Sequence, residues 1–236
     1  RFRPREGWLV LAVALALVMC VTGAALAVGW TPEARVVGVT AVGGFLLGLV
    51  LAKRPLDGRL AWLLLTLYGL LVALIVLARW LPPTAVLRYG WWATANYWRQ
   101  NTALFLDRAA SWFVAVFRGN PSQETIVFSL GLGLAGWFLA AYAAWSIFRQ
   151  RRPLLGLTAL GFALAVNNYF GLAEIWWLAA FVGLAVLLAA LVYYIALEEE
   201  WQRTGMDYSA EIKLELLIFG GGTAAVLLIL AMMLPA

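Results

Sequence analysis

The chain has 236 residues, of which 64% are hydrophobic and 12% are charged, with thirteen Trp, one Cys and no His. This composition excludes an ordinary soluble globular domain. The net charge of +5 comes mainly from short basic segments between apolar runs, which is typical of membrane topology rather than of a nucleic-acid-binding surface. The single cysteine, Cys20, excludes an internal disulfide framework.

Long apolar runs recur along the chain, and about 20 helical residues cross roughly 30 Å of hydrocarbon. We therefore predict an all-α polytopic membrane protein, with a single transmembrane helical domain over residues 1–236. The first run is longer than the apolar region of a signal peptide, so we expect an uncleaved span there. Seven spans are predicted, at about 8–30, 35–52, 60–81, 124–148, 154–170, 173–197 and 215–234.

The segment 85–118, between the third and fourth spans, has an amphipathic pattern. Its pattern predicts an external helix, or two joined helices, lying in the plane of the membrane surface. The apolar face comprises Trp91, Ala95, Trp98, Thr102, Phe105, Ala109, Trp112 and Val116. The opposite arc comprises Asn96, Gln100, Asp107, Arg108, Ser111 and Arg118.

Three interpretations of this amphipathic segment remain open at the level of sequence. It is a lid packed over the external ends of the spans, a docking surface for a partner protein, or a platform for a pigment or quinone. Aromatic stripes serve packing far more often than cofactor binding, so no cofactor is predicted beyond bound lipids. Because Trp is enriched in binding hot spots, the candidate partner-interface residues are Trp91, Trp92, Trp98 and Trp112.

The distribution of Lys and Arg predicts the orientation. Basic residues gather at the N-terminus and in the segments 53–59, 149–152 and 203–213, whereas the opposite short connections carry only Arg35. The positive-inside rule then places the N-terminus in the cytoplasm and the C-terminus outside a bacterial inner membrane. The basic cytoplasmic turn between the fourth and fifth spans is formed by Arg149, Arg151 and Arg152.

An acidic connector is predicted over residues 198–214, before the last span. Asp207, Glu211 and Glu215 have four-residue spacing and share one helix face, which raises the question of a hard-cation site. The spacing of a calcium loop is missing, and no His or Cys lies nearby. The pattern favours a solvated cytoplasmic connector whose acids meet basic loops. Its candidate residues are Trp201, Asp207, Tyr208 and Glu211.

Small and polar residues inside the spans carry weaker signals. Gly43, Gly44, Gly131 and Gly133 predict close approach between helices. Asn167 and Asn168 predict a tight turn into the sixth span, rather than a polar substrate site.

Catalytic patterns are missing from the sequence. It contains no nucleotide-binding loop, haem-ligating His, catalytic carboxylate pair or nucleophile–base pair. We therefore predict no catalytic, metal-binding or cofactor-binding residues, and no enzymatic activity for this chain.

Two stretches resemble a known family. WQRTGMDYSAEIKLELL, at 201–217, resembles the connector in the N-terminal transmembrane domain of bacterial transglutaminase-like membrane proteins. WSIFRQRRPLLGL, at 145–157, is similar to the Trp, basic turn and Pro of the same domain. The order of three spans, an external amphipathic segment, three spans, a connector and a last span is also similar. This resemblance covers nearly all of the chain.

The resemblance implies that the last span leads outward to a domain with a Cys-His-Asp triad. None of that triad is present, since the chain has no His and its only Cys lies in a span. We expect the membrane part of a longer protein or a stand-alone version of it, acting as a non-catalytic anchor or scaffold. An accessory subunit of a respiratory or photosynthetic complex is the alternative, and a small transporter is less favoured. Expected partners are membrane lipids, other membrane subunits or the protein's own external domain, with no nucleic acid.

Overall fold

The computed structural model describes residues 7–171, 174–204 and 212–233. It is 84% helical, and no strand occurs among these residues, so the predicted all-α polytopic class is confirmed. Six helices in the described part are long and apolar enough to cross a membrane. They are α1 (Gly7–Val28), α2 (Arg35–Ala52), α3 (Gly58–Leu77), α6 (Ile126–Phe148), α7 (Pro153–Gly171) and α8 (Trp176–Thr204).

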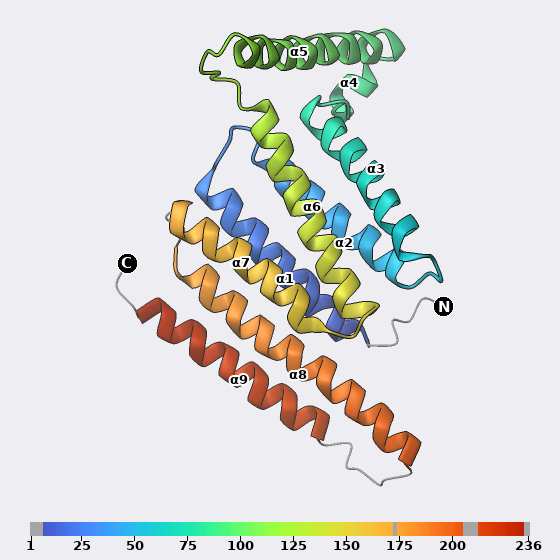
Figure 1. Ribbon diagram of the computed structural model, residues 1–236, viewed down its shortest axis with the longest axis vertical. Helices are drawn as coiled ribbons and strands as arrows, with labels where there is room; N and C mark the ends of the chain where they lie inside the picture. Colours follow the sequence, from blue (N-terminus) through green and yellow to red (C-terminus); the bar gives the residue numbers. More distant parts are fainter. Residues whose placement is uncertain (1–6, 172–173, 205–211, 234–236) are drawn as a thin grey trace.

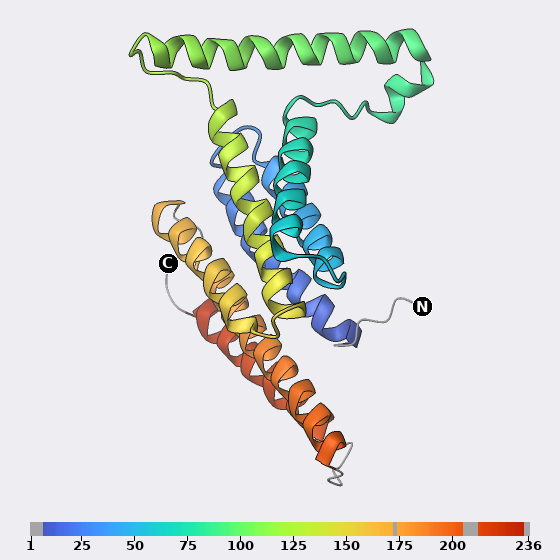
Figure 2. The same cartoon turned by 45° about the vertical axis from the view of Figure 1, so that its right-hand side comes forward.

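The predicted seventh span, at 215–234, corresponds to α9 (Ile212–Met233), which runs beside α8 in both ribbon views (Figures 1 and 2). The helix of the sixth span continues past the predicted span end at 197, because α8 runs through residues 198–204 of the proposed connector. This stretch is rich in Glu, Gln and Arg, which favour helix, and the first helix-breaking residue is Gly205. The connector residues Asp207, Tyr208 and Glu211 lie outside the described residues.

The closest packing in the bundle is between α2 and α6. A Cβ atom added at Gly44 would lie 2.3 Å from the backbone oxygen of Trp137, and one at Gly48 would lie 2.8 Å from the Cα of Ala141. The two backbones touch only because these positions carry no side chain, which is how small residues drive helix association in lipid. Gly44 therefore acts as the sequence predicts, whereas Gly131 has no close neighbour.

Trp137 joins three helices at this contact. Its side chain is 2% exposed, and a Cβ on either Gly43 or Gly69 would collide with its ring. The indole Nε1 donates a hydrogen bond of 2.9 Å to the backbone oxygen of Leu65 in α3. An indole N–H in an apolar interior needs such a partner, so Trp137 holds α3 against the α2–α6 pair.

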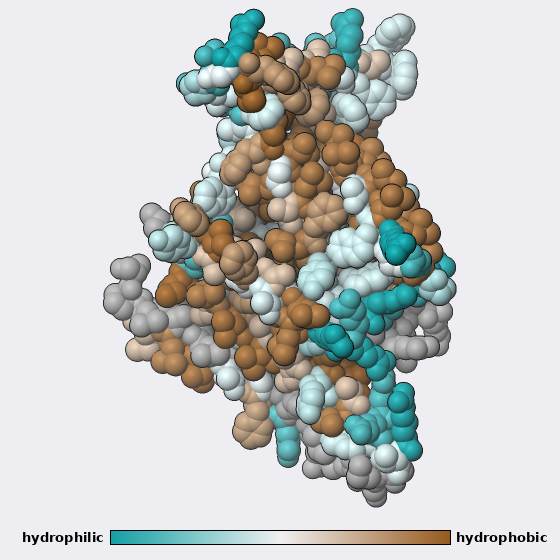
Figure 3. Space-filling view, in the orientation of Figure 1, coloured by the Kyte–Doolittle hydropathy of each residue, from teal (hydrophilic) through white to brown (hydrophobic). Residues whose placement is uncertain are grey.

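The amphipathic segment forms two joined helices, α4 (Thr84–Arg88) and α5 (Trp91–Phe117). They meet at Gly90, whose φ of +87° favours glycine. In Figures 1 and 2, α5 lies across the end of the bundle where α3 ends and α6 begins, transverse to those helices. The surface in Figure 3 is largely brown and apolar through the body, with teal polar atoms among apolar ones at the top, where α5 lies, and further teal atoms along the lower right. An apolar body between two polar ends suits a bilayer.

The α2–α6 contact yields a stability prediction. Gly44→Ala is expected to lower the free energy of unfolding by about 1–3 kcal/mol, because the added Cβ meets backbone atoms that cannot rotate away. Gly131→Ala, on α6 with open space around it, is the matched control and should leave stability unchanged or slightly higher. Reversible denaturation of both variants in detergent micelles measures the difference. Equal stability of the two variants would contradict the contact.

Candidate functional site

One face of α5 is turned toward the bundle. Thr94 is its only buried residue, and a row of half-buried side chains follows at helical spacing. Phe105 packs against the small apolar cluster of Val36, Val37 and Leu77. The half-buried row is formed by Tyr97, Asn101, Phe105, Arg108, Trp112 and Ala115.

The first half of α5 is hydrogen-bonded to the residues that follow α3. The Trp98 indole donates to the backbone oxygen of Trp80 at 2.8 Å, and the Trp80 indole donates to the Thr102 hydroxyl at 3.0 Å. The Tyr97 hydroxyl reaches the backbone oxygen of Leu81 at 3.4 Å. Two of the tryptophans therefore use their polar edges to fix α5 to the chain that leads into it.

The second half of α5 is held by an ionic cluster, which we call the Arg108 tether. Arg108 donates from Nη1 to Glu33 at 2.8 Å and from Nε to Glu124 at 2.9 Å. The second carboxylate oxygen of Glu33 accepts from the hydroxyls of Thr125 and Ser129, both at 3.2 Å. The cluster joins α5 to the α1–α2 connection and to the start of α6.

Glu33 is charged at neutral pH despite being only 14% exposed. Burial alone would raise the pKa of this carboxyl group. The hydrogen bond and charge of Arg108, with the Ser129 and Thr125 hydroxyls, outweigh burial and leave the pKa below its ordinary value. The arrangement stabilises an ion pair that joins α5 to the bundle.

The sequence-based position of Arg108 is wrong. The helical pattern places it on the polar arc opposite the apolar face, whereas the structure turns it toward the bundle. An arginine at the edge of an apolar face keeps its charge by meeting acids from other segments, here Glu33 and Glu124. Sequence reasoning did not identify Glu33. One sequence signal could have pointed to this ion pair. Glu33 is an acid in a short connection between spans, and the amphipathic segment carries Arg108.

The four predicted interface tryptophans separate into two pairs. Trp91 is 67% exposed and Trp92 is 85% exposed, whereas Trp98 is 38% exposed and hydrogen-bonded, and Trp112 is half-buried. The first pair is therefore the more accessible to a partner.

Other apolar residues of α5 extend this exposed surface. Phe117 is nine residues from Arg108, which places it half a turn round the helix, on the side away from the bundle. Trp92 lies on the same side as Phe117 by the same periodicity. We name the α5 outer surface by its exposed residues Trp92, Leu106, Phe113 and Phe117.

The predicted basic turn at the other end of the bundle is a structural junction. Arg149 donates to the backbone oxygens of Arg54 and Leu56, at 2.5 and 3.2 Å, and so ties the end of α6 to the α2–α3 connection. Arg151 binds both carboxylate oxygens of Glu199 on α8, at 2.5 and 3.0 Å. The expected meeting of acidic residues with a basic loop is confirmed for Glu199.

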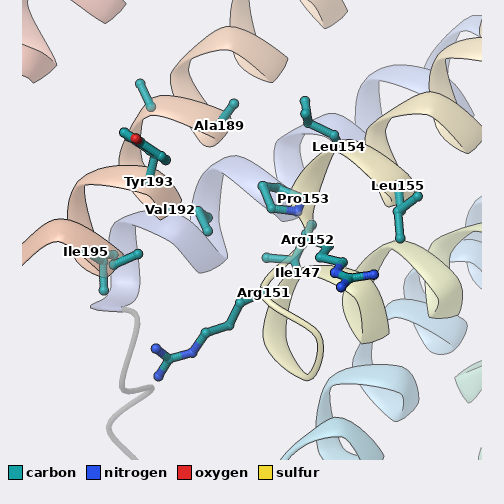
Figure 4. A pocket seen from close by; sticks show the side chains of 12 residues that line it. Ile147, Arg151, Arg152, Pro153, Leu154, Leu155, Ala189, Val192, Tyr193 and Ile195 are labelled. Atoms are coloured by element: carbon teal, nitrogen blue, oxygen red, sulfur yellow. The ribbon is translucent and has the colours of Figure 1, made fainter. Parts of the chain in front are cut away.

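A pocket of about 660 Å³ lies beside this turn. Figure 4 shows apolar side chains of α7 and α8 around it, with the Arg151 side chain extending away from them. Arg151 and Arg152 line its edge. This geometry suits hydrocarbon better than a charged ligand. The apolar wall includes Pro153, Leu154, Ala189, Val192 and Tyr193.

The remaining predicted site residue in the described part is Trp201. It lies on α8, where its ring meets Tyr194 edge-on with a centroid separation of 6.4 Å, so it packs within its own helix. Within residues 7–171, 174–204 and 212–233, no group of three or more His, Cys, Asp or Glu is arranged to hold a metal ion.

Comparison with known proteins adds no relative. No family model matches the chain, and neither a curated protein nor a solved structure matches it. The resemblance to the membrane domain of transglutaminase-like proteins therefore stays a prediction.

Loss of the tether is expected to release the second half of α5. Arg108→Gln removes both ionic contacts and leaves Glu33 without its cation, so the distance between α5 and α6 should become broadly distributed. Spin labels at Ser111→Cys and Phe128→Cys, with Cys20→Ala to remove the native thiol, measure it. Arg99→Gln is the matched control, because Arg99 bonds only to Asn96 of α5 itself in the contacts observed. A narrow distribution in Arg108→Gln would contradict the tether.

The tether is also expected to depend on pH. The folded-state pKa of Glu33 is lowered, so its contribution is fully present above the ordinary value of 4.5 and is lost as pH falls through the folded-state value. The spin-label distance should therefore broaden in acid below about pH 4.5. Glu33→Gln has no ionisable group at this position, so its spin-label distance should not change over this pH range. An unchanged acid transition in that variant would show that another group controls it.

Proposed function

We propose that this domain is a non-catalytic membrane anchor and scaffold that holds a protein partner, or an attached external domain, against α5. The observation that carries the proposal is the α5 outer surface. α5 is 27 residues long, so it extends about 40 Å across the end of the bundle. The Arg108 tether and the Trp80 hydrogen bonds hold it in place, while its far side presents large apolar side chains.

Membrane anchoring alone does not account for this far side. An in-plane helix directs its apolar face toward lipid and its polar face toward water. The bundle-facing side of α5 already contains Trp98, Phe105 and Trp112, yet Trp92 and Phe117 on the other side are 85% and 86% exposed. Large exposed apolar groups on a fixed helix favour a protein partner, and Trp is enriched among residues that dominate binding.

The proposed setting is a bacterial inner membrane, with the N-terminus cytoplasmic and both α5 and the C-terminus external. The resemblance to transglutaminase-like membrane proteins favours the protein's own external domain as the partner. Another subunit of a larger membrane complex, respiratory or photosynthetic, is the alternative. A transporter is less favoured because the spans contain no ionisable midplane pair in the sequence.

Site-specific photo-crosslinking tests the proposal in native membranes. A photoreactive phenylalanine analogue at Trp92 should form an adduct with a polypeptide segment that is not part of helices α1–α9. That segment belongs either to a partner protein or to an attached external domain. The same analogue at Leu67, a 58% exposed residue of the apolar helix α3, is the control and should react with lipid. Lipid adducts alone at both positions would overturn the scaffold role of α5.

Once the partner is identified by that adduct, Trp92→Ala should weaken its association by about 2 kcal/mol, roughly thirtyfold. The free energy of unfolding should change little, because the Trp92 side chain is 85% exposed. Leu67→Ala is the matched control for loss of an exposed apolar side chain. Titration of purified partner against both variants in detergent gives the comparison, and equal affinities would exclude a role for Trp92 in binding.

A further inference from the structure

Unpartnered buried polar atoms lie in the α1–α2 connection and near the end of α7. Among the described residues, the buried side-chain atoms without a hydrogen-bond partner are Thr31 Oγ1, Asn167 Nδ2 and Asn168 Oδ1. Their two segments are joined by a hydrogen bond of 2.8 Å from the Trp30 indole to Asn167 Oδ1. Buried polar groups are almost always paired in folded proteins, so an unpaired buried atom such as Asn167 Nδ2 requires a cause.

The position of Asn167 differs from the sequence-based expectation. Asn167 does not form a turn, because α7 continues to Gly171. Its side chain is 8% exposed and lies within the helical bundle. An indole N–H can only donate, so the amide oxygen faces Trp30 and the amide nitrogen is the group left to bind something else.

Asn167 lines a cavity of about 500 Å³ between α1, α2, α6 and α7. None of the lining residues is ionisable, and the walls are mostly Ala, Val, Leu and Gly. The Thr22 hydroxyl in the wall is already bonded to the backbone oxygen of Val18 at 3.0 Å. Phe162 and Val166 also line the cavity and are 72% and 39% exposed, so it opens sideways on the apolar flank of the bundle.

We propose that this cavity binds an amphiphilic lipid with an uncharged oxygen acceptor at the head of a hydrocarbon chain. The acceptor oxygen takes the hydrogen bond from Asn167 Nδ2, and the chain lies between α7 and the α2–α6 pair. An anionic head is disfavoured because no cation lines the cavity. Water alone does not match the site, since a buried water needs two to four polar partners, and the other polar side chains in the wall, Thr22 and Trp30, are already hydrogen-bonded.

The depth of Asn167 fits this ligand. It lies four residues from the end of α7, or about 6 Å along the helix axis, close to one end of the span. The α7 residues that line the cavity extend from Ala159 to Asn167, about 12 Å along the axis toward the bundle centre. An acceptor near the membrane surface with hydrocarbon running inward is the geometry of an ester lipid, and also of an isoprenoid carrying a carbonyl group.

Filling the cavity provides the test. Ala163→Phe places a ring in the cavity, whereas Ala165→Phe adds the same ring at an exposed position two residues along α7 that does not line it. Native mass spectrometry of the full chain after detergent purification should show one bound amphiphile in the wild type and in Ala165→Phe. The amount bound should fall by roughly tenfold in Ala163→Phe. Retention of lipid by Ala163→Phe, or equal loss in both variants, would overturn the proposal.

A second variant tests the proposal in case Ala163→Phe does not fold. Asn167→Leu removes the amide donor together with the acceptor for the Trp30 indole, and Trp30→Phe, which removes the same indole contact but keeps the amide, is its control. Monooleoylglycerol added to delipidated wild type should raise its melting temperature, and the rise should be lost in Asn167→Leu but kept in Trp30→Phe. The mass of the co-purified amphiphile distinguishes an acyl glycerolipid from an isoprenoid. Absence of both a bound amphiphile and a thermal shift in the wild type would show that the cavity holds no lipid. Neither measurement involves α5, so the outcome is independent of the scaffold role.

Discussion

The direct contact between the backbones of α2 and α6 is the constraint on which the rest of the bundle depends. Gly44 and Gly48 leave no room for side chains there, so Trp137 extends sideways and bonds to Leu65 of α3. α3 ends where the excursion through α4 and α5 begins, and α6 starts where it returns. Fixing α2, α3 and α6 together therefore fixes both attachments of α5, and the transverse helix must extend between them.

Different forces hold the two parts of the molecule together. Inside the apolar body, lipid tails are as apolar as the side chains, so close packing of small residues and shielded hydrogen bonds such as that of the Trp137 indole determine the arrangement. At the α5 end, the Arg108 tether holds the segments together by ionic contacts. Because the tether requires ionised Glu33, attachment of α5 is sensitive to pH, whereas the α2–α6 contact is not.

The sequence predicts the elements well and their long-range pairing poorly. Apolar runs and amphipathic periodicity identify the helices because hydrocarbon imposes both length and composition. The apolar run does not give the end of α8, since helix-favouring residues continue past it. Arg108 and Asn167 were misassigned because their partners, Glu33 and Trp30, are 75 and 137 residues away along the chain. Pairing over such separations leaves no periodic pattern.

The short connection between α1 and α2 links the two proposed roles. Trp30 in this connection bonds to Asn167 beside the lipid cavity, and Glu33, three residues later, binds Arg108 of α5. Backbone hydrogen bonds from Ala34 to Thr31, at 3.1 Å, and from Val36 to Glu33, at 2.9 Å, hold the connection as a tight turn. A movement of this turn therefore displaces both contacts together. A lipid bound at Asn167 would contact this turn through Trp30, and a partner bound on α5 would contact it through Arg108 and Glu33. The two binding surfaces are separate, but both are connected to this turn.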